Sequence, residues 1–245
     1  MRRSLALLGG GALTGAYWLP GAAAVVPAAA RWFGIPTRAA SGQGVVLTFD
    51  DGPHPSGTPA VLAELERAGA QAVFFVSGEQ VARYPEIVCD VVASGHELGL
   101  HGYRHQTRRQ WTRRLFVDDT RRSIDALCSA SGVVPRLYRP PHGVFSSAGL
   151  REVLRLGLEP LLWSRWGRDW EARATPSSIM RRATAGIEAR DVILLHDADH
   201  YSAPGSWCGT VAALPGILGA LDRAGLTTQR WVERERDGVS ARPPR

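Results

Sequence analysis

The segment of residues 45–53, Val-Val-Leu-Thr-Phe-Asp-Asp-Gly-Pro, constrains the fold more than any other part of the chain. Its apolar residues form a run that suits a strand buried on both faces, as in a parallel sheet. Two carboxylates, Asp50 and Asp51, stand at the end of that strand, and Gly52-Pro53 predicts a turn. Burying charged carboxylates at the end of such a strand costs free energy, so two of them are expected there only where they bind a metal or exchange protons. A turn in which one Asp accepts hydrogen bonds from loop amides explains one carboxylate but not two.

The rest of the chain alternates strand patterns with helix patterns. Strands are predicted at residues 45–50, 72–76, 96–100, 137–139, 158–163 and 192–195, and helices at residues 58–68, 81–93, 115–130, 148–156, 177–189 and 211–224. Repeated strand–helix units of this length predict an α/β fold with a parallel sheet, and their number indicates a (β/α) barrel. A chain of 245 residues fits one such domain with a short appendage.

The N-terminus has the pattern of a signal peptide or membrane anchor. Arg2-Arg3 is followed by a stretch without charged residues up to Ala30, which is long enough to span a bilayer. Alanines at 22–24 and 28–30 offer cleavage sites, and an extension packed on the domain is the alternative. We therefore expect a signal or anchor, a linker, a domain and a tail at residues 1–31, 32–43, 44–232 and 233–245. Deletion of residues 1–40 should then leave a soluble, active domain.

The positive charge does not identify a partner by itself. The formal net charge is +6, and all 29 basic residues are arginines. They are scattered along the chain, so we expect no nucleic-acid partner, and an anionic membrane or wall polymer suits the charge equally well. Cys89, Cys128 and Cys208 are far apart and include no CxxC, which favours separate thiols over a metal site or a disulfide framework.

The unusual polar residues lie where the predicted strands end. Because the carboxyl ends of parallel strands share one face of a barrel, these residues should meet at one mouth: Asp50, Asp51, His101, Arg139, Asp169 and His196. His101 and His105 are spaced i, i+4, which would place both imidazoles on one side of a helical turn. Two histidines and one aspartate form the ligand set of a catalytic zinc with open positions. A His-x-x-x-His pair alone is weak evidence of a metal site, but beside Asp50-Asp51 it is much stronger.

Five short motifs occur in order: Thr48-Phe49-Asp50-Asp51-Gly52-Pro53, His101-x-x-x-His105, Arg139-Pro140-Pro141, Asp169-Trp170 and Leu194-Leu195-His196. Together they resemble the motifs of the polysaccharide deacetylases with a NodB homology domain, over about residues 43–232. The resemblance implies a NodB-like fold, a distorted (β/α) barrel of about seven or eight strands, in agreement with the strand–helix pattern.

The resemblance also implies roles for individual residues. Asp51, His101 and His105 would hold a divalent metal, with Zn²⁺ the expected ion. Asp50 would be the general base that acts on a metal-bound water, and Arg139 would keep Asp50 charged and aimed. His196 would be the general acid, with Asp169 favouring its protonated form. Substrate contacts are expected from Pro140, His142, Trp163, Trp170 and Leu194, with the two tryptophans forming an apolar wall around the acetyl group.

The chain departs from the family pattern in three places. Gly102 stands where Ser or Thr usually follows the first metal-binding histidine, so a side-chain hydroxyl that could brace the loop is lost. His142 stands where Tyr is common, although the backbone N–H near it can still donate to an oxyanion. Arg165 and Trp166 lie where a second acidic residue often occurs. An arginine-lined cleft would favour an anionic glycan.

The sequence thus predicts an extracytoplasmic enzyme, secreted or anchored, that removes acetyl groups from an acetylated glycan. The N-acetyl groups of amino sugars in a polysaccharide or cell-wall glycan are the expected target. A glycan-binding pseudoenzyme on the same fold is the alternative, although every metal and acid–base residue is present. A glycosidase is disfavoured because Asp50 and Asp51 are neighbours and cannot flank a sugar bond at the required separation.

Overall fold

The predicted strands form one parallel sheet in the computed structural model, which describes residues 16–231. Its seven strands, in spatial order β5-β4-β3-β2-β1-β7-β6, pair in parallel throughout. Their bounds are β1 Val46–Asp50, β2 Ala72–Val76, β3 Glu97–Leu100, β4 Leu137–Tyr138, β5 Glu159–Pro160, β6 Arg165–Trp166 and β7 Val192–His196. Every residue of β1 is buried, as the apolar run at 45–49 predicted.

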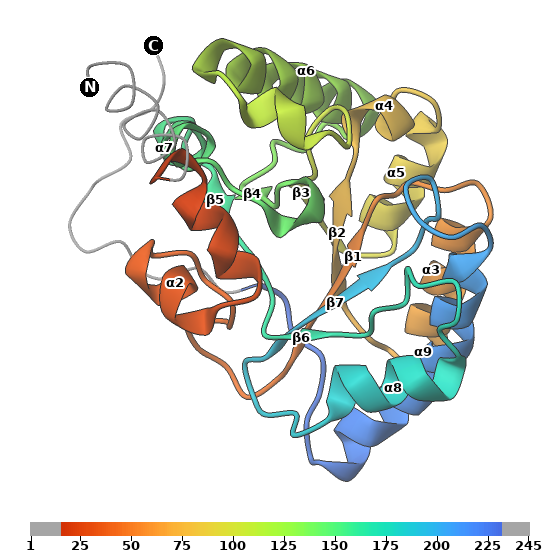
Figure 1. Ribbon diagram of the computed structural model, residues 1–245. Coiled ribbons are helices and arrows are strands. Elements are labelled where there is room, and N and C mark those ends of the chain that lie inside the picture. Colours follow the sequence, from red (N-terminus) through yellow and green to blue (C-terminus); the bar gives the residue numbers. More distant parts are fainter. Residues whose placement is uncertain (1–15, 232–245) are drawn as a thin grey trace, which may run out of the picture.

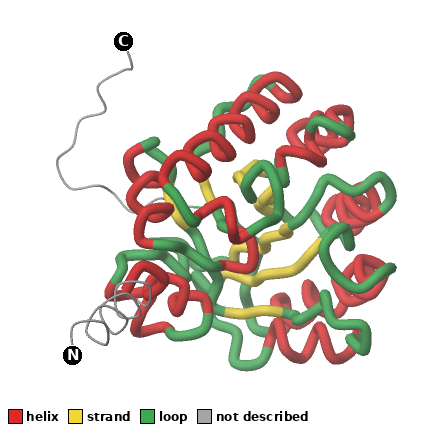
Figure 2. Tube along the Cα trace, turned by 45° about the horizontal axis from the view of Figure 1, so that its top comes forward, coloured by secondary structure: helices red, strands yellow, loops and turns green. Residues whose placement is uncertain are grey.

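Helices surround the curled sheet, so that the strands occupy the interior of the molecule (Figures 1 and 2). The α-helices are α2 Pro27–Trp32, α3 Gly57–Arg67, α4 Gly78–Val81, α5 Pro85–Ala93, α6 Arg113–Ser131, α7 Ser147–Arg155, α8 Pro176–Thr184 and α9 Ser206–Arg223. The 3-10 helices are η1 Leu19–Ala24, η2 Thr107–Gln110 and η3 Pro141–Gly143. The predicted distorted (β/α) barrel is confirmed as a seven-stranded, half-closed form.

Two predicted elements differ from the structure for identifiable reasons. The helix expected at 81–93 is divided into α4 and α5 at Pro85, which has no N–H to donate and disfavours helical geometry at Tyr84. The strand expected at 158–163 ends at Pro160. The carbonyls of Leu161 and Leu162 accept hydrogen bonds from the buried guanidinium of Arg139, so they bind a side chain and not a neighbouring strand.

Residues 16–40 pack against the domain. Ala23, Ala30 and Ile35 are buried in the same core cluster as Leu162. The Pro36 carbonyl accepts from the Leu162 N–H, and Arg38 forms an antiparallel bridge with Asp191 at the start of β7. The segment thereby joins the chain after β5, an edge strand, to the start of β7, which is next to the other edge strand, β6. Residues 32–43 therefore lie on the domain, where the sequence suggested a linker.

The remaining parts of the expected N-terminal signal and C-terminal tail, residues 1–15 and 233–245, lie outside the described residues. Within residues 16–231, no helix has both the length and the apolar character needed to cross a bilayer.

The packing of residues 16–40 changes the expected result of deleting residues 1–40. The deletion should lower the free energy of unfolding by more than about 3 kcal/mol, because burial of Ile35 alone contributes about 1.5–3 kcal/mol and the hydrogen bond from Leu162 to Pro36 about 1 kcal/mol. Urea denaturation measures the change. Deletion of residues 1–15 is the control, since it removes none of these contacts. Equal stability of the two deletion variants would show that residues 16–40 are a linker after all.

Candidate active site

A cavity of about 210 Å³ lies at the carboxyl ends of the strands. It brings together residues from six separate stretches of the chain, as the strand-end pattern predicted. The residues that line it are Asp50, Asp51, His101, His105, His142, Gly143, Trp163, Trp166, Trp170, Leu194, His196, Tyr201 and Ser202. Arg139 and Asp169 are buried behind this lining, and each contacts one of its polar residues.

Three side chains in the cavity form a candidate metal site. The Nε2 atoms of His101 and His105 each lie 3.4 Å from Oδ1 of Asp51. The three possible ligand atoms lie within 4.8 Å of one another. Oδ1 of Asp51 is buried and accepts no hydrogen bond from the described residues. A buried carboxylate oxygen without a donor is costly, and a cation between it and the two imidazoles would satisfy it.

The protonation states of these groups also suit a divalent cation. Burial of Asp51 raises its pKa, but the neighbouring imidazoles of His101, His196 and His105 lower it further, so the net pKa lies well below the ordinary value. Burial lowers the pKa of His105 to about 3, although the Asp51 charge opposes this. An ionised aspartate and a neutral imidazole are the forms that bind metal. The residues therefore fit the expected ion.

The two histidines do not lie on a helix, so the helical-turn prediction for residues 101–105 is wrong. His101 directly follows β3, and Gly102 has a φ of 78°, in the left-handed region that glycine adopts without strain. A Cβ at Gly102 would lie 3.3 Å from Oδ2 of Asp119, which itself accepts a hydrogen bond from the Tyr103 N–H. The Ser123 hydroxyl donates to the Gly102 carbonyl. Side chains of α6 thus brace the loop without a hydroxyl at position 102.

His101 is oriented by the backbone. Its Nδ1 lies 2.9 Å from the Arg139 carbonyl, and a carbonyl can only accept, so Nδ1 carries the proton. The Nε2 lone pair is then free to face Asp51. Asp51 itself has a φ of 78°, an uncommon backbone conformation that costs roughly 1–3 kcal/mol and is found mainly at functional sites.

Asp50 is held by the buried Arg139. Nη1 of Arg139 lies 2.7 Å from Oδ1 of Asp50 and 2.7 Å from the Thr48 hydroxyl, and the guanidinium packs 4.1 Å from the centre of the Phe75 ring. Arg139 is fully buried and also donates to two backbone carbonyls. Oδ2 of Asp50 lies 3.9 Å from Nε2 of His101, so it faces the candidate metal site. Asp50 and Asp51 are therefore adjacent in sequence but have different partners.

His196, at the end of β7, is paired with Asp169. Oδ1 of Asp169 lies 2.9 Å from Nδ1 of His196, while Oδ2 accepts from the His196 N–H and the Thr210 hydroxyl. Burial lowers the pKa of His196, but the Asp169 carboxylate and the charges of Asp51 and Asp50 outweigh it and raise the pKa to about 10. Nε2 of His196 lies 4.0 Å from Oδ2 of Asp51, so a protonated imidazole faces the cavity.

Aromatic rings form one wall of the cavity. Trp163, Trp166 and Trp170 follow one another with ring centres 5.9 and 5.7 Å apart, and Trp170 meets His196 edge-on at 5.3 Å. Leu194 lines the same cavity. This wall offers an apolar surface next to the imidazole of His196.

The turn at η3 carries the remaining predicted substrate contacts. His142 has a φ of 58°, and its ring lies 4.3 Å from that of His105 in an edge-on arrangement. Pro140 is buried and accepts a hydrogen bond from the Gly143 N–H, and it is absent from the residues that line the cavity. Pro140 therefore shapes the turn that presents His142 and Gly143.

The prediction of an arginine-lined cleft is wrong. Arg165 forms an ion pair with Asp191 and donates to the carbonyls of Ala185 and Gly186. Arg168 forms an ion pair with Glu171. Neither arginine lines the cavity, because each points to a carboxylate outside it. The tryptophans of the same segment, and not its arginines, face the site.

Sequence reasoning missed several residues that line the site or lie beside it. Tyr201 stacks on His105, with ring centres 4.4 Å apart and planes at 9°, and its hydroxyl donates to Glu79. Nothing in the sequence indicates that Tyr201 contacts His105. Trp166 could have been found from its position between Trp163 and Trp170. Asp197 is buried against Gly52 and hydrogen-bonded to the Thr58 hydroxyl, and burial raises its pKa to about 7. Its position directly after His196 was the available signal.

Known proteins share this fold and these stretches of sequence. The family model described as polysaccharide deacetylase matches residues 37–161. A chitooligosaccharide deacetylase of Azorhizobium caulinodans is 32% identical over 194 residues, which cover 76% of this chain and 91% of that protein. A peptidoglycan-N-acetylglucosamine deacetylase of Bacillus cereus is 34% identical over 185 residues, covering 74% and 83% of the two chains.

A solved structure gives the same result. A family 4 carbohydrate esterase from Streptomyces lividans, in complex with acetate, superposes with a TM-score of 0.67 at 31% sequence identity and covers 77% of this chain and 93% of its own. The family model spans half of the chain, and the relatives are matched over most of their length. This chain therefore belongs to the polysaccharide deacetylase family of hydrolases.

Proposed function

We propose that this protein is a metal-dependent deacetylase that hydrolyses the N-acetyl groups of amino sugars in an acetylated glycan. The single observation that carries the proposal is the arrangement of the Asp51, His101 and His105 donor atoms in one cavity with the carboxylate of Asp50 and the imidazole of His196. The names of the relatives, which are deacetylases of chitooligosaccharides and of peptidoglycan N-acetylglucosamine, support the substrate class.

Asp51, His101 and His105 would hold the ion, with Zn²⁺ the expected one. When bound, a divalent ion polarises the amide carbonyl and makes water more acidic. The mixed oxygen and nitrogen donors suit zinc, and the pKa values of Asp51 and His105 keep both groups in the ligating form.

Asp50 would take the proton from the attacking water. Arg139 binds Oδ1 of Asp50 at 2.7 Å and holds the carboxylate in one orientation, so that Oδ2 faces the cavity. The proposed base and the proposed ligand differ in their surroundings. Asp50 forms an ion pair with Arg139, whereas Asp51 faces three imidazoles. Different surroundings of this kind give two carboxylates different roles.

His196 would give a proton to the departing amine. Its Nδ1 is bound to Asp169, so Nε2 is the atom that can donate into the cavity. The water oxygen bonds to the carbonyl carbon first, the C–N bond then breaks as the nitrogen takes the proton from His196, and the products are acetate and a free amine on the sugar. The backbone N–H near His142 is the proposed donor to the carbonyl oxygen, and Trp163 and Trp170 would surround the acetyl methyl group.

Acetate release from acetylated glycans tests the proposal. Purified protein is incubated with chitin oligomers, peptidoglycan or acetylated xylan, with and without a chelator. We expect acetate from at least one amino-sugar glycan and none after chelation. Release of acetate from acetylated xylan alone would show that the enzyme hydrolyses O-acetyl esters and not N-acetyl groups. Failure with all three glycans by protein that contains its metal would favour the glycan-binding pseudoenzyme.

Replacement of a proposed ligand should remove the metal. Purified protein should contain about one divalent ion per chain, and His101→Ala should weaken binding by at least roughly 100-fold, because a nitrogen ligand fixed by the Arg139 carbonyl is lost. Metal content by mass spectrometry and competition with a chelator measure this. His96→Ala is the control, since His96 lies outside the cavity. Full metal occupancy in His101→Ala would rule out the assignment.

The pH dependence should report the Asp169–His196 pair. A raised pKa keeps the proposed acid protonated to higher pH, so the alkaline fall in rate, at which His196 loses its proton, should lie at high pH. Asp169→Asn removes the main group that raises this pKa and should move the alkaline limb to lower pH by about 1–3 units. Profiles of kcat against pH for the two proteins measure the shift. An unchanged alkaline limb would show that His196 is not the acid.

We also propose that the protein acts outside the cytoplasm. The support is the N-terminal pattern, in which Arg2-Arg3 precedes the uncharged stretch to Ala30. Cell fractionation tests this part of the proposal. Recovery of the protein in the cytosol alone would contradict it.

A further inference from the structure

The segment before β1 exposes an unusual number of apolar side chains. Eight large apolar side chains are exposed in residues 16–231, and four of them lie between residues 19 and 32: Leu19, Val25, Val26 and Trp32. Trp32 is 85% exposed and Val25 67%. Exposed apolar groups that lie close together in a folded segment indicate an interaction surface.

The orientation of this surface is fixed by the fold. Pro20 and Ala23 of η1 and Ala30 of α2 are buried against the domain, so the opposite side of the segment must face outward. Gly21 approaches Val144, and Ala24 approaches Gly143, both beside the turn at η3. The exposed side chains are therefore held in place, and the segment that carries them adjoins one wall of the active-site cavity through Ala24 and Gly143.

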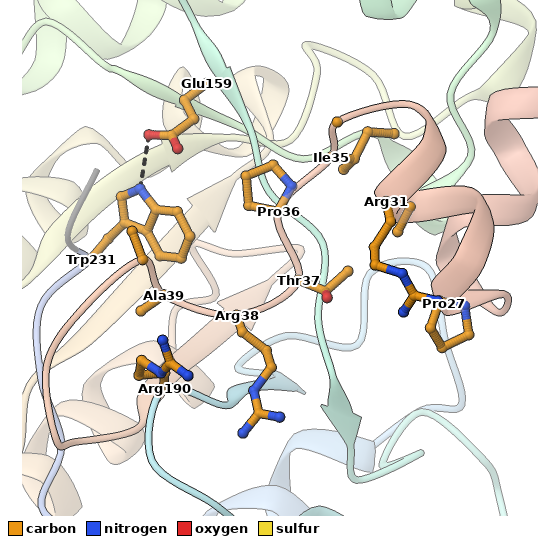
Figure 3. Close-up of a pocket in the computed structure, with 13 residues that line it drawn as sticks. Pro27, Arg31, Ile35, Pro36, Thr37, Arg38, Ala39, Glu159, Arg190 and Trp231 are labelled. Atoms are coloured by element: carbon orange, nitrogen blue, oxygen red, sulfur yellow. Dashed lines mark hydrogen bonds between the residues drawn. The ribbon is translucent and has the colours of Figure 1, made fainter. Parts of the chain in front are cut away.

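Arginines lie on α2 and next to it, and Arg31 directly precedes the exposed Trp32. Figure 3 shows Arg31, Arg38 and Arg190 around a cavity of about 610 Å³ between α2 and the start of β7. Arg38 is paired with Glu188 and Asp191, whereas no carboxylate among residues 16–231 forms an ion pair with Arg31 or Arg190. The one acidic residue in the lining, Glu159, accepts a hydrogen bond from the Trp231 indole. Arg31 and Arg190 are therefore the arginines of this rim that are available to bind an anion.

The chain that leads into this surface has the same character. Residues 4–15 contain no charged residue and follow Arg2-Arg3. An apolar stretch of this length, continuous with exposed valines and a tryptophan and flanked by arginines, combines the features of a segment at a membrane interface.

We propose that the face formed by η1, α2 and the arginines of the adjoining cavity docks on the surface of a bilayer that contains anionic phospholipids. Val25, Val26 and Trp32 would enter the boundary between headgroups and acyl chains, and Arg31 and Arg190 would lie at the phosphates. A second copy of this chain is a poorer fit, because two such faces would bring their arginines together. The proposal goes beyond the catalytic one and does not depend on it.

Vesicle sedimentation of the full chain tests the docking face. The vesicles are phosphatidylcholine alone or phosphatidylcholine mixed with phosphatidylglycerol. We expect tighter binding to the anionic vesicles, and a loss of about tenfold or more for the triple variant Val25→Ser, Val26→Ser, Trp32→Ser. Val134→Ser is the matched apolar control, because Val134 is 73% exposed on the loop between α6 and β4. It should bind as the unaltered chain does.

Charge reversal separates the arginines from the apolar side chains. Arg31→Glu should weaken binding to anionic vesicles by about fivefold or more and leave binding to neutral vesicles unchanged. Arg223→Glu is the matched control, since both arginines are exposed in the last turn of a helix. All variants should keep the thermal midpoint and the acetate release from soluble chitin oligomers, because the altered side chains face outward.

Three results would overturn the proposal. Equal sedimentation of the triple variant and Val134→Ser would show that residues 1–15 alone bind the membrane. Equal binding of Arg31→Glu and Arg223→Glu to anionic vesicles would show that the arginines of this face do not contribute to membrane binding. Binding that is indifferent to phosphatidylglycerol would exclude anionic lipid as the partner. Absence of acetate release from every protein would contradict the proposed deacetylase and leave the vesicle result valid.

Discussion

Asp50→Asn should keep the metal and lose about 10²–10⁴-fold in kcat, whereas Asp51→Asn should lose both metal and activity. Asp50 and Asp51 are chemically identical, so only their surroundings can separate their roles. Oδ1 of Asp50 is bound by Arg139 at 2.7 Å, and an amide oxygen can still accept that bond. An amide cannot take a proton from water at neutral pH, so the substitution removes the base and leaves the ligands in place.

Asp51 has no comparable partner. Its buried Oδ1 accepts no hydrogen bond from the described residues and lies 3.4 Å from the Nε2 atoms of His101 and His105. Removing its charge therefore removes the only anionic donor of the candidate metal site. Metal content and kcat, measured on the same preparations, separate the two variants, and a surface variant such as Asp118→Asn is the control. Loss of metal by Asp50→Asn with an active Asp51→Asn would reverse the assignment.

Arg139→Met should lower the free energy of unfolding by about 3–5 kcal/mol, since it breaks a buried ion pair and leaves the Asp50 carboxylate without its cation. The same change removes the donors to the Thr48 hydroxyl and to the carbonyls of Leu161 and Leu162. Arg139 is fully buried, so solvent cannot replace these bonds. Urea denaturation measures the loss.

Arg114→Met is the matched control for this substitution. Arg114 is almost fully exposed, and its ion pair with Asp118 is long at 3.8 Å, so the change should cost less than about 1 kcal/mol. Adding Asp50→Asn to Arg139→Met should restore part of the lost stability, because the unpaired charge is then absent. If Arg139→Met and Arg114→Met are equally stable, the buried pair does not hold the site together.

The sequence alone was sufficient for the fold class and for most of the site. Buried parallel strands read as continuous apolar runs, and the run before Asp50 and the run before His196 became β1 and β7, neighbours in the sheet. Because parallel strands present their carboxyl ends on one side, polar residues at those ends had to converge. The position of a polar residue at the end of a strand can be found from the local sequence, and in a parallel sheet it places Asp51, His101 and His196 close together.

Only the tertiary structure could decide contacts between distant segments. The strand expected at 158–163 is shorter because the Arg139 guanidinium donates hydrogen bonds to the carbonyls of Leu161 and Leu162. Residue propensities for strands do not include such a contact with a distant side chain. The stacking of Tyr201 on His105 likewise depends on how two loops meet. Arg165 has the same local sequence context as the tryptophans beside it, and a tertiary ion pair with Asp191 turns it away from the cavity.

The N-terminal segment shows the same division most clearly. Its lack of charge is a property of composition, which indicates an apolar environment but not whether that environment is lipid or protein. The structure shows that Ala23, Ala30 and Ile35 pack in the core, while Val25 and Trp32 face outward. Which side of a short helix is buried depends on the surface it meets, and that surface is assembled from strands and turns more than a hundred residues further along the chain.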